Sequence, residues 1–167
     1  TERGHAYVLR GDSVGFKKAL TQYQKALEFD SQTDSAKQIR LEIGKVLALA
    51  GDPNKALAHF NKIVSQYPSF LPAYLERGLI YMTLRQYEKG ISDYTHVIEK
   101  DDDAAFDAYL ARGQAFMKSG QFSRAEKDFA EAIDAQTDNY AGFLARGHAF
   151  IALGSIDDAE PDLTQAV

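Results

Sequence analysis

Histidine and aspartate are the residue types in this chain that could hold a metal ion or move a proton, and neither is spaced for that work. The four histidines lie far apart in the sequence, at His5, His59, His96 and His148, so they lack the close ligand spacing of a zinc site. The run Asp101–Asp103, with Asp107 beyond it, lacks the glycine and the alternating ligands of a calcium loop. A solvated turn is the simpler interpretation. We therefore expect no metal site and no cofactor.

Covalent and phosphate-binding chemistry also lacks the residues that it needs. The chain contains no cysteine, which excludes disulfides, thiolate metal sites and cysteine nucleophiles. The sequence shows no Ser-His-Asp arrangement, no glycine-rich phosphate loop and no carboxylate pair placed for acid–base catalysis. We expect no catalytic residues, and hence no enzyme. The absence of cysteine fits a reducing compartment and slightly favours the cytoplasm.

Composition narrows the classes of partner. Of the 167 residues, 45% are hydrophobic and 26% are charged, and the net charge is −5 with lysine and arginine scattered among the acids. A nucleic-acid surface needs a basic stripe, which this pattern does not supply. No run of apolar residues is long enough to cross a bilayer, and no leader is recognisable. The chain does not begin with methionine, so we expect a fragment or a processed chain.

A short cluster recurs along the chain and organises it. Arg-Gly is followed three residues on by an aromatic residue at Arg3-Gly4/Tyr7, Arg77-Gly78/Tyr81, Arg112-Gly113/Phe116 and Arg146-Gly147/Phe150. A variant, Ile43-Gly44/Leu47, fills the gap, and from Gly44 the glycines recur after 34, 35 and 34 residues. A period of this size indicates one small unit stacked several times.

Each unit divides into two helical stretches. In the third, Tyr74, Gly78 and Tyr81 lie at i, i+4 and i+7, one face of a helix. After a brief break, Gly90, Tyr94 and Val97 repeat that spacing. Two helices joined by so short a turn must run antiparallel, so the sequence predicts an all-α fold. Helix-end signals mark other turns, at Gly51-Asp52-Pro53, Ser119-Gly120 and Gly154.

Small residues and aromatics alternate in a way that predicts close helix packing. A glycine or alanine on each helix lets the two backbones approach, and the aromatic residues fill the space beside them. The residues assigned to this packing are Gly44, Gly78, Gly113, Gly147, Ala56, Gly90, Ala125, Ala159, Tyr81, Phe116 and Phe150. Two departures are expected: Pro161 should kink or end the last helix, and longer stretches at 11–19 and 30–35 should make the first unit dock less regularly.

These features resemble the tetratricopeptide repeat, a helix–turn–helix unit of about 34 residues with a large residue, Leu-Gly, Tyr, Ala, Phe and Pro at set places. Tyr74, Tyr109 and Phe143 take the leading place, and Phe60, Tyr94 and Phe129 take the second aromatic place. The resemblance covers the whole chain as five units. They span residues 1–33, truncated at the start and with a longer turn, 37–70, 71–104, 106–139 and 140–167, the last truncated at its end. It implies a right-handed superhelix of antiparallel helix pairs whose first helices line a concave groove.

One departure from the family pattern is systematic. The family has leucine before the glycine, whereas this chain has arginine in four units, and an aspartate follows sixteen residues later in three pairs: Arg77/Asp93, Arg112/Asp128 and Arg146/Asp162. In the second unit both positions change together, to Ile43 and His59. We infer an ion pair between the two helices of each unit. The alternative is an arginine that lies along its helix with its head in water.

A second apolar stripe on the first helices is the candidate binding surface. Under the resemblance these positions point into the groove; they are Leu41, Lys45, Leu75, Leu79, Met82, Leu110, Gln114, Met117, Leu144, His148 and Ile151. The stripe either accepts an extended segment or helix of a partner or packs neighbouring first helices together. A subset of the family grips acidic C-terminal tails with lysine, asparagine and arginine. The matching places here include Leu41, Glu76 and Asp107, so that clamp is not expected.

The sequence thus predicts a noncatalytic scaffold that binds a protein or peptide, without nucleic-acid binding or membrane insertion. Two alternatives stay open. One is a regulatory or adaptor domain of a larger enzyme or chaperone complex. The other is self-association through an uncapped end near Leu163 and Val167, because repeat arrays normally cover their last apolar face.

Overall fold

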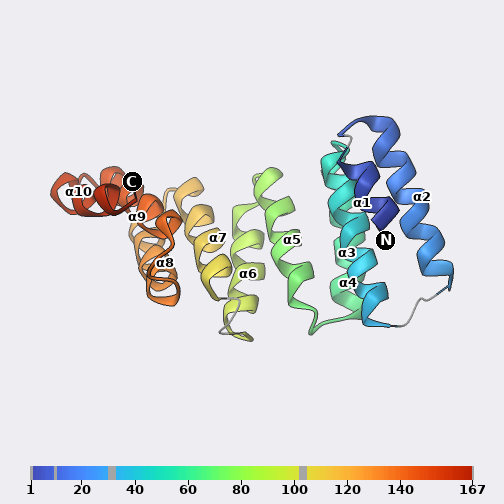
Figure 1. The fold of residues 1–167 in the computed structure, drawn as a ribbon. Helices are drawn as coiled ribbons and strands as arrows, with labels where there is room; N and C mark the ends of the chain where they lie inside the picture. The colour runs from blue at the N-terminus through green and yellow to red at the C-terminus, as the bar shows by residue number, and fades with distance from the viewer. Residues whose placement is uncertain (1, 10, 30–32, 102–104, 167) are drawn as a thin grey trace. The chain divides into compact units, whose positions relative to one another are not determined.

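The computed structural model describes residues 2–9, 11–29, 33–101 and 105–166. It contains ten α-helices and, within those residues, no strand (Figure 1). The all-α fold predicted from the repeat is confirmed. Among the described helices, none has both the length and the apolar character needed to cross a bilayer.

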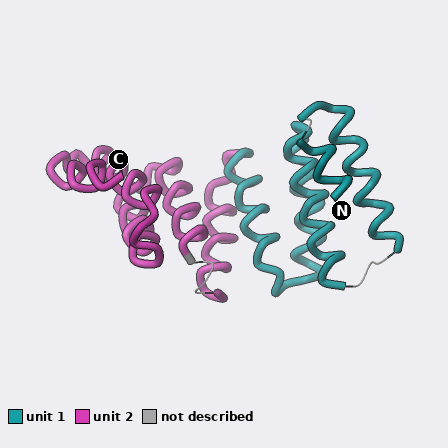
Figure 2. Tube along the Cα trace, in the orientation of Figure 1, with its two compact units in different colours: residues 1–84 teal, residues 85–167 magenta. Residues whose placement is uncertain are grey.

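The chain forms two compact units, residues 1–84 and 85–167 (Figure 2). The first unit contains α1 (Glu2–Val8), α2 (Ser13–Phe29), α3 (Asp34–Leu49), α4 (Pro53–Gln66) and α5 (Leu71–Thr83). The second contains α6 (Tyr87–Ile98), α7 (Ala105–Lys118), α8 (Phe122–Ala135), α9 (Tyr140–Leu153) and α10 (Ile156–Gln165).

Within each unit every helix packs against the next one in sequence. Short turns make these neighbours antiparallel. Two further contacts join α3 to α5 and α7 to α9, so the first helices of consecutive repeats also lie next to each other. This arrangement places the residues of the predicted stripe on adjacent helices in each unit.

The turn between the two helices of a repeat uses a left-handed residue. Gly51, Gly120 and Gly154 have φ of +82°, +78° and +82°, a conformation that glycine adopts without steric cost. Arg85 takes the corresponding place in the third repeat, with φ of +56°. Behind Gly51, the Asp52 side chain accepts a hydrogen bond from the Lys55 backbone N–H at 3.1 Å, and Pro53 is the first helical residue, as the sequence predicted.

The core of the second repeat shows why glycine occupies the first helix. A Cβ added at Gly44 would lie 2.5 Å from the Phe60 ring, which is fully buried. Gly113 makes the same close approach to Phe129, and a Cβ at Gly147 would lie 2.8 Å from Leu163. The glycine on α3, α7 or α9 therefore receives a large side chain from the following helix, and a bulkier residue would overpack the pair.

The structure differs from the sequence-based expectation at the longer first repeat and at Pro161. The additional residues of the first repeat lengthen α2, which has 17 residues against 14 in α4, instead of enlarging the turn. The helix α10 runs through Pro161 to Gln165, so this proline does not end it. The link at 30–35 lies partly outside the described residues.

Candidate functional site

The first-helix face is the name we give to the stripe of first-helix residues that the family resemblance predicted to be a binding surface. In the first unit it comprises Leu41 and Lys45 on α3 with Leu75, Leu79 and Met82 on α5. In the second unit it comprises Leu110, Gln114 and Met117 on α7 with Leu144, His148 and Ile151 on α9. Because α3 contacts α5 and α7 contacts α9, each unit carries one continuous patch of this face.

The side chains of the first-unit patch are partly buried. Leu41 is only 5% exposed and packs with Phe60, Ile63 and Ile80 in the core, so its role in the structure is packing. Leu75 and Met82 are half-buried, whereas Leu79 is 55% exposed. The accessible apolar surface of this patch therefore lies on α5.

The second-unit patch is more open. Leu144 is 38% exposed and Ile151 is 46% exposed, and both project from α9. Gln114 and His148 are also exposed, and Leu110 and Met117 are half-buried. Apolar side chains of this size, with a few polar ones beside them, are typical of an adaptable protein-binding surface.

In the first-unit patch, Lys45 lies close to two acidic side chains, Glu42 and Glu76. Lys45 Nζ lies 3.3 Å from Glu42 Oε1 on its own helix and 3.9 Å from Glu76 Oε1 on α5, and His5 Nε2 lies 3.6 Å from Glu42 Oε2. Burial raises the pKa of Glu76, the nearby Lys45 ammonium lowers it, and Glu42 adds to the increase. The sequence analysis did not assign Glu42 to the site. The repeat pattern gives no signal for Glu42, because the Glu42 and Lys45 pair does not recur: the next repeat holds Glu76 and Leu79 at these places.

Beneath Glu42 lies a buried phenol. Tyr23 is fully buried, and burial together with the Glu42 carboxylate raises the pKa of its hydroxyl to about 12. The hydroxyl has no hydrogen-bond partner among the described residues, and the ring meets His5 edge-on at 5.8 Å. The Tyr23 hydroxyl therefore keeps its proton at physiological pH.

The arginines beside the repeat glycines bind aspartates on the neighbouring helix. Arg112 donates from Nε and Nη2 to the two Asp128 oxygens, both at 2.8 Å. Arg146 does the same to Asp162, at 2.7 and 2.8 Å. These hydrogen bonds raise the pKa of both guanidinium groups. Asp128 and Asp162 are each 5% exposed, so the pairs are partly buried and hold α7 to α8 and α9 to α10.

The contacts of the other repeats involve different residues. Arg77 donates to Asn61 Oδ1 at 3.1 Å within the first unit, and its pairing with Asp93, which belongs to the second unit, stays a prediction. In the second repeat, Ile43 is buried and the His59 Nε2–H donates to the Arg40 carbonyl at 2.9 Å. Burial lowers the pKa of His59, and that hydrogen bond opposes part of the effect. The arginines and His59 are therefore structural residues.

Metal-ligating side chains are not gathered anywhere in the described part of the chain. Among those residues no group of three or more His, Cys, Asp or Glu side chains could hold a metal ion. The histidines lie on different helices, at α1, α4, α6 and α9. Asp102 and Asp103 of the acidic run lie outside the described residues.

Two family models, both described as tetratricopeptide repeat, match residues 15–69 and 75–141. Together they span most of the chain, from within α2 to the start of α9. The chain belongs to the tetratricopeptide repeat family. That membership supports a protein-interaction scaffold as the class of function.

Solved structures extend the likeness of this tetratricopeptide chain to nearly its full length. It is similar to a crystal structure of MamA, with 22% identity, a TM-score of 0.80 and coverage of 98% of this chain and 91% of that one. It is also similar to MamA from Desulfovibrio magneticus RS-1, with 17% identity, a TM-score of 0.78 and coverage of 99% and 94%. A tetratricopeptide repeat protein from Parabacteroides merdae gives 15% identity, a TM-score of 0.78 and coverage of 99% and 66%. At these identities the likeness concerns the fold.

A curated relative is similar over a shorter stretch. The UDP-N-acetylglucosamine–peptide N-acetylglucosaminyltransferase of Giardia intestinalis is 33% identical over 61 residues, which is 36% of this chain. The chain spans only 4% of the length of that protein. The match carries no activity over to this chain.

Proposed function

We propose that this tetratricopeptide chain holds a peptide segment or a helix of a partner protein against its first-helix face. The observation that carries the proposal is the exposure of apolar side chains of this face on α5 and on α9. Leu79, Leu144 and Ile151 are 55%, 38% and 46% exposed, although their helices are packed on other sides. Exposed leucine and isoleucine side chains on the first-helix face of each unit favour binding of an apolar stripe from another protein.

The charges beside this face narrow the kind of segment. Lys45, the basic member of the face, already lies close to Glu42 and Glu76, and Asp107 at the start of α7 is exposed. An acidic tail would meet these carboxylates, which would repel it. The proposed ligand is therefore an apolar segment without acidic residues, and the clamp for C-terminal carboxylates is not part of the proposal.

A peptide selection with matched variants tests the proposal. Peptides are selected from a random library on the immobilised chain, and their dissociation constants are measured by calorimetry for Leu79→Glu and Leu144→Glu. A charge placed in an apolar contact should weaken binding by at least about tenfold, or 1.4 kcal/mol. Val14→Glu is the control, because Val14 is 51% exposed on α2, away from the face.

The result that would contradict the proposal is equal affinity of the three variants and the parent chain. Circular dichroism of each variant checks that the helices are retained. Nucleic acid stays outside the proposal because the net charge is −5; tight binding of single-stranded RNA at low salt would oppose that exclusion.

A regulatory or adaptor segment of a larger enzyme is the second candidate. The similarity to a stretch of a glycosyltransferase favours it, since such an array would present partners to a catalytic domain elsewhere. An immunoblot of the endogenous protein tests this candidate. A mass well above that of 167 residues supports it, and a mass equal to that of 167 residues contradicts it.

A further inference from the structure

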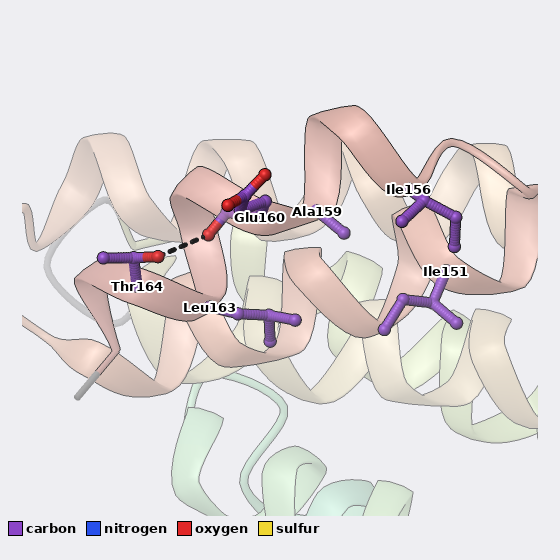
Figure 3. Close-up of a pocket in the computed structure, with 6 residues that line it drawn as sticks. All are labelled: Ile151, Ile156, Ala159, Glu160, Leu163 and Thr164. Carbon is purple, nitrogen blue, oxygen red and sulfur yellow. Dashed lines mark hydrogen bonds between the residues drawn. The ribbon is translucent and has the colours of Figure 1, made fainter.

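Two kinds of exposed apolar surface occur in this chain. Figure 3 shows an open hollow of about 780 Å³ between α9 and α10, lined by Ile151, Ile156, Ala159 and Leu163 among others. The helix α10 is the last one in the sequence, and a further repeat would cover this hollow as α9 covers α8. By contrast, α3 and α5 have helices before and after them in the chain, so the surface that they expose does not depend on where the sequence begins or ends.

Glu42 on α3 and Glu76 on α5 hold the same place in their repeats, two residues before the repeat glycine. Their side chains are 16% and 27% exposed. Two nitrogen atoms lie near the Glu42 carboxylate, Lys45 Nζ at 3.3 Å and His5 Nε2 at 3.6 Å. Among the residues that the structure describes, Glu76 has only Lys45 as such a neighbour, with Nζ 3.9 Å from Oε1. Glu76 is therefore the less compensated of the two carboxylates.

The neighbour that Glu76 lacks is a cation on its own helix. One residue after the glycine, the second repeat holds Lys45, whereas the third repeat holds Leu79. Because Leu79 follows Glu76 by three residues on α5, the two side chains lie on the same face of that helix. Leu79 is 55% exposed. An open apolar side chain thus lies beside Glu76 where an ammonium group lies beside Glu42.

The charge of Glu76 is costly in this environment. Burial raises the pKa of Glu76, the Lys45 ammonium lowers it, and the Glu42 carboxylate raises it further, so that the pKa ends above its ordinary value. Together these three side chains supply one positive and two negative charges when ionised. A half-buried carboxylate in this state gains from any ligand that brings a cation to it.

A buried hydroxyl beneath the same cluster also lacks a partner. Tyr23 is fully buried under Glu42, whose carboxylate adds to the effect of burial in raising the pKa of the hydroxyl. Among the described residues the hydroxyl has no hydrogen-bond partner. Buried polar groups in folded proteins are nearly all hydrogen-bonded. The polar cluster of the first-unit patch therefore keeps hydrogen-bonding capacity that the chain itself leaves unfilled.

We propose that the partner segment packs an apolar side chain on Leu79 and reaches the Glu76 carboxylate with a neighbouring lysine or arginine. The charged end of this basic residue takes at Glu76 the place that Lys45 takes at Glu42. The residue belongs to the segment of the proposed function, on which this assignment rests. A half-buried ion pair is screened little by salt, so the affinity keeps the weak salt dependence of an apolar contact.

Peptide selection on matched chains tests the proposal. Peptides are selected from a random library on the parent chain and on Glu76→Gln, which keeps the size of the side chain. Lysine or arginine should be enriched at one position of the peptides selected on the parent chain, and Glu76→Gln should abolish that enrichment. Glu28→Gln, at an exposed residue of α2, removes the same charge away from the face and should preserve it. Circular dichroism checks that each variant keeps its helices.

Dissociation constants of one selected peptide give the second readout. Replacing its enriched basic residue by glutamine should weaken binding to the parent chain by about tenfold. The same replacement should change binding to Glu76→Gln by less than about twofold, because the partner of the basic residue is then absent. Binding to Glu28→Gln should again fall by about tenfold.

Equal enrichment on Glu76→Gln and the parent chain, or equal loss of affinity on both, would overturn the proposal. Selected peptides that lack a basic residue, yet lose affinity with Leu79→Glu, would overturn it too and leave the proposed function in place. Peptides that bind Leu79→Glu and Leu144→Glu as tightly as the parent, or a library that yields no peptide, would contradict the proposed function and this assignment together.

Discussion

Asp128 is a buried carboxylate with both oxygens bound by Arg112. A bidentate pair in such a site differs from a surface ion pair, because loss of one partner leaves the other charge without compensation. We expect Arg112→Ala to lower the free energy of unfolding by about 3–5 kcal/mol. The exposed Lys127 on α8 offers a control, since Lys127→Ala should change it by less than about 0.5 kcal/mol.

A double-mutant cycle separates the pair from the two side chains themselves. With Asp128→Ala added, the double variant should be more stable than the sum of the single changes implies, with a coupling of about 1.5–3 kcal/mol. Urea unfolding of the four proteins gives this number. A coupling near zero would mean that the arginine only lies along its helix, the alternative that the sequence left open.

His59 predicts a specific pH dependence. Burial lowers its pKa, so the unfolded chain, with an ordinary value of about 6.5, takes up a proton that the folded chain resists. The unfolding free energy should therefore fall as the pH drops from 7 toward 5. His59→Gln, which can still donate to the Arg40 carbonyl, should flatten this fall. An identical pH profile for His59→Gln and the parent would refute the prediction.

At the scale of the helix, the left-handed turn residue sets where one helix ends and the next begins. Gly120 has φ of +78° with no atom near its missing side chain, so Gly120→Ala should cost about 1–2 kcal/mol through backbone strain alone. Arg85 bears this strain already. We expect Arg85→Gly to be neutral or to stabilise by up to about 1 kcal/mol. Thermal unfolding compares the two, and equal destabilisation by both changes would contradict the account.

The positions of the helix pairs were predictable from the sequence, whereas the burial of individual side chains was not. The recurring glycines and aromatics fixed the helix pairs because packing requires a small residue opposite a large one, as at Gly44 and Phe60. Leu41 and Leu144 share one place in the repeat, yet they are 5% and 38% exposed. The difference depends on which neighbouring side chains cover each position, and a single repeat pattern does not contain that information.

The acidic contacts of Lys45 illustrate the same limit for the candidate site. The position of Lys45 in the repeat predicted that it is a polar residue of the groove. Its contacts with Glu42 and Glu76, however, depend on the spacing between α3 and α5. The pattern also predicted the Arg112 and Arg146 partners correctly, because both members of each pair recur at a fixed interval.

At the scale of the whole molecule, two compact units each present a patch of the first-helix face. Leu79 is the open apolar residue of the first patch, and Leu144 and Ile151 are those of the second. Because the proposed contact is apolar and the nearby charges are paired, we expect affinity for a partner segment to depend weakly on salt. Strong loss of affinity between 50 mM and 500 mM salt, measured by calorimetry, would point to a charged surface instead.

Methyl-resolved NMR of the chain, titrated with a library-selected peptide, tests the central claim most directly. The account predicts that the methyl signals of Leu79 and Leu144, assigned by substitution, shift on binding while the signal of Val14 on α2 stays in place. Shifts confined to Val14 and other residues of the second helices, with Leu79 and Leu144 unchanged, would contradict it.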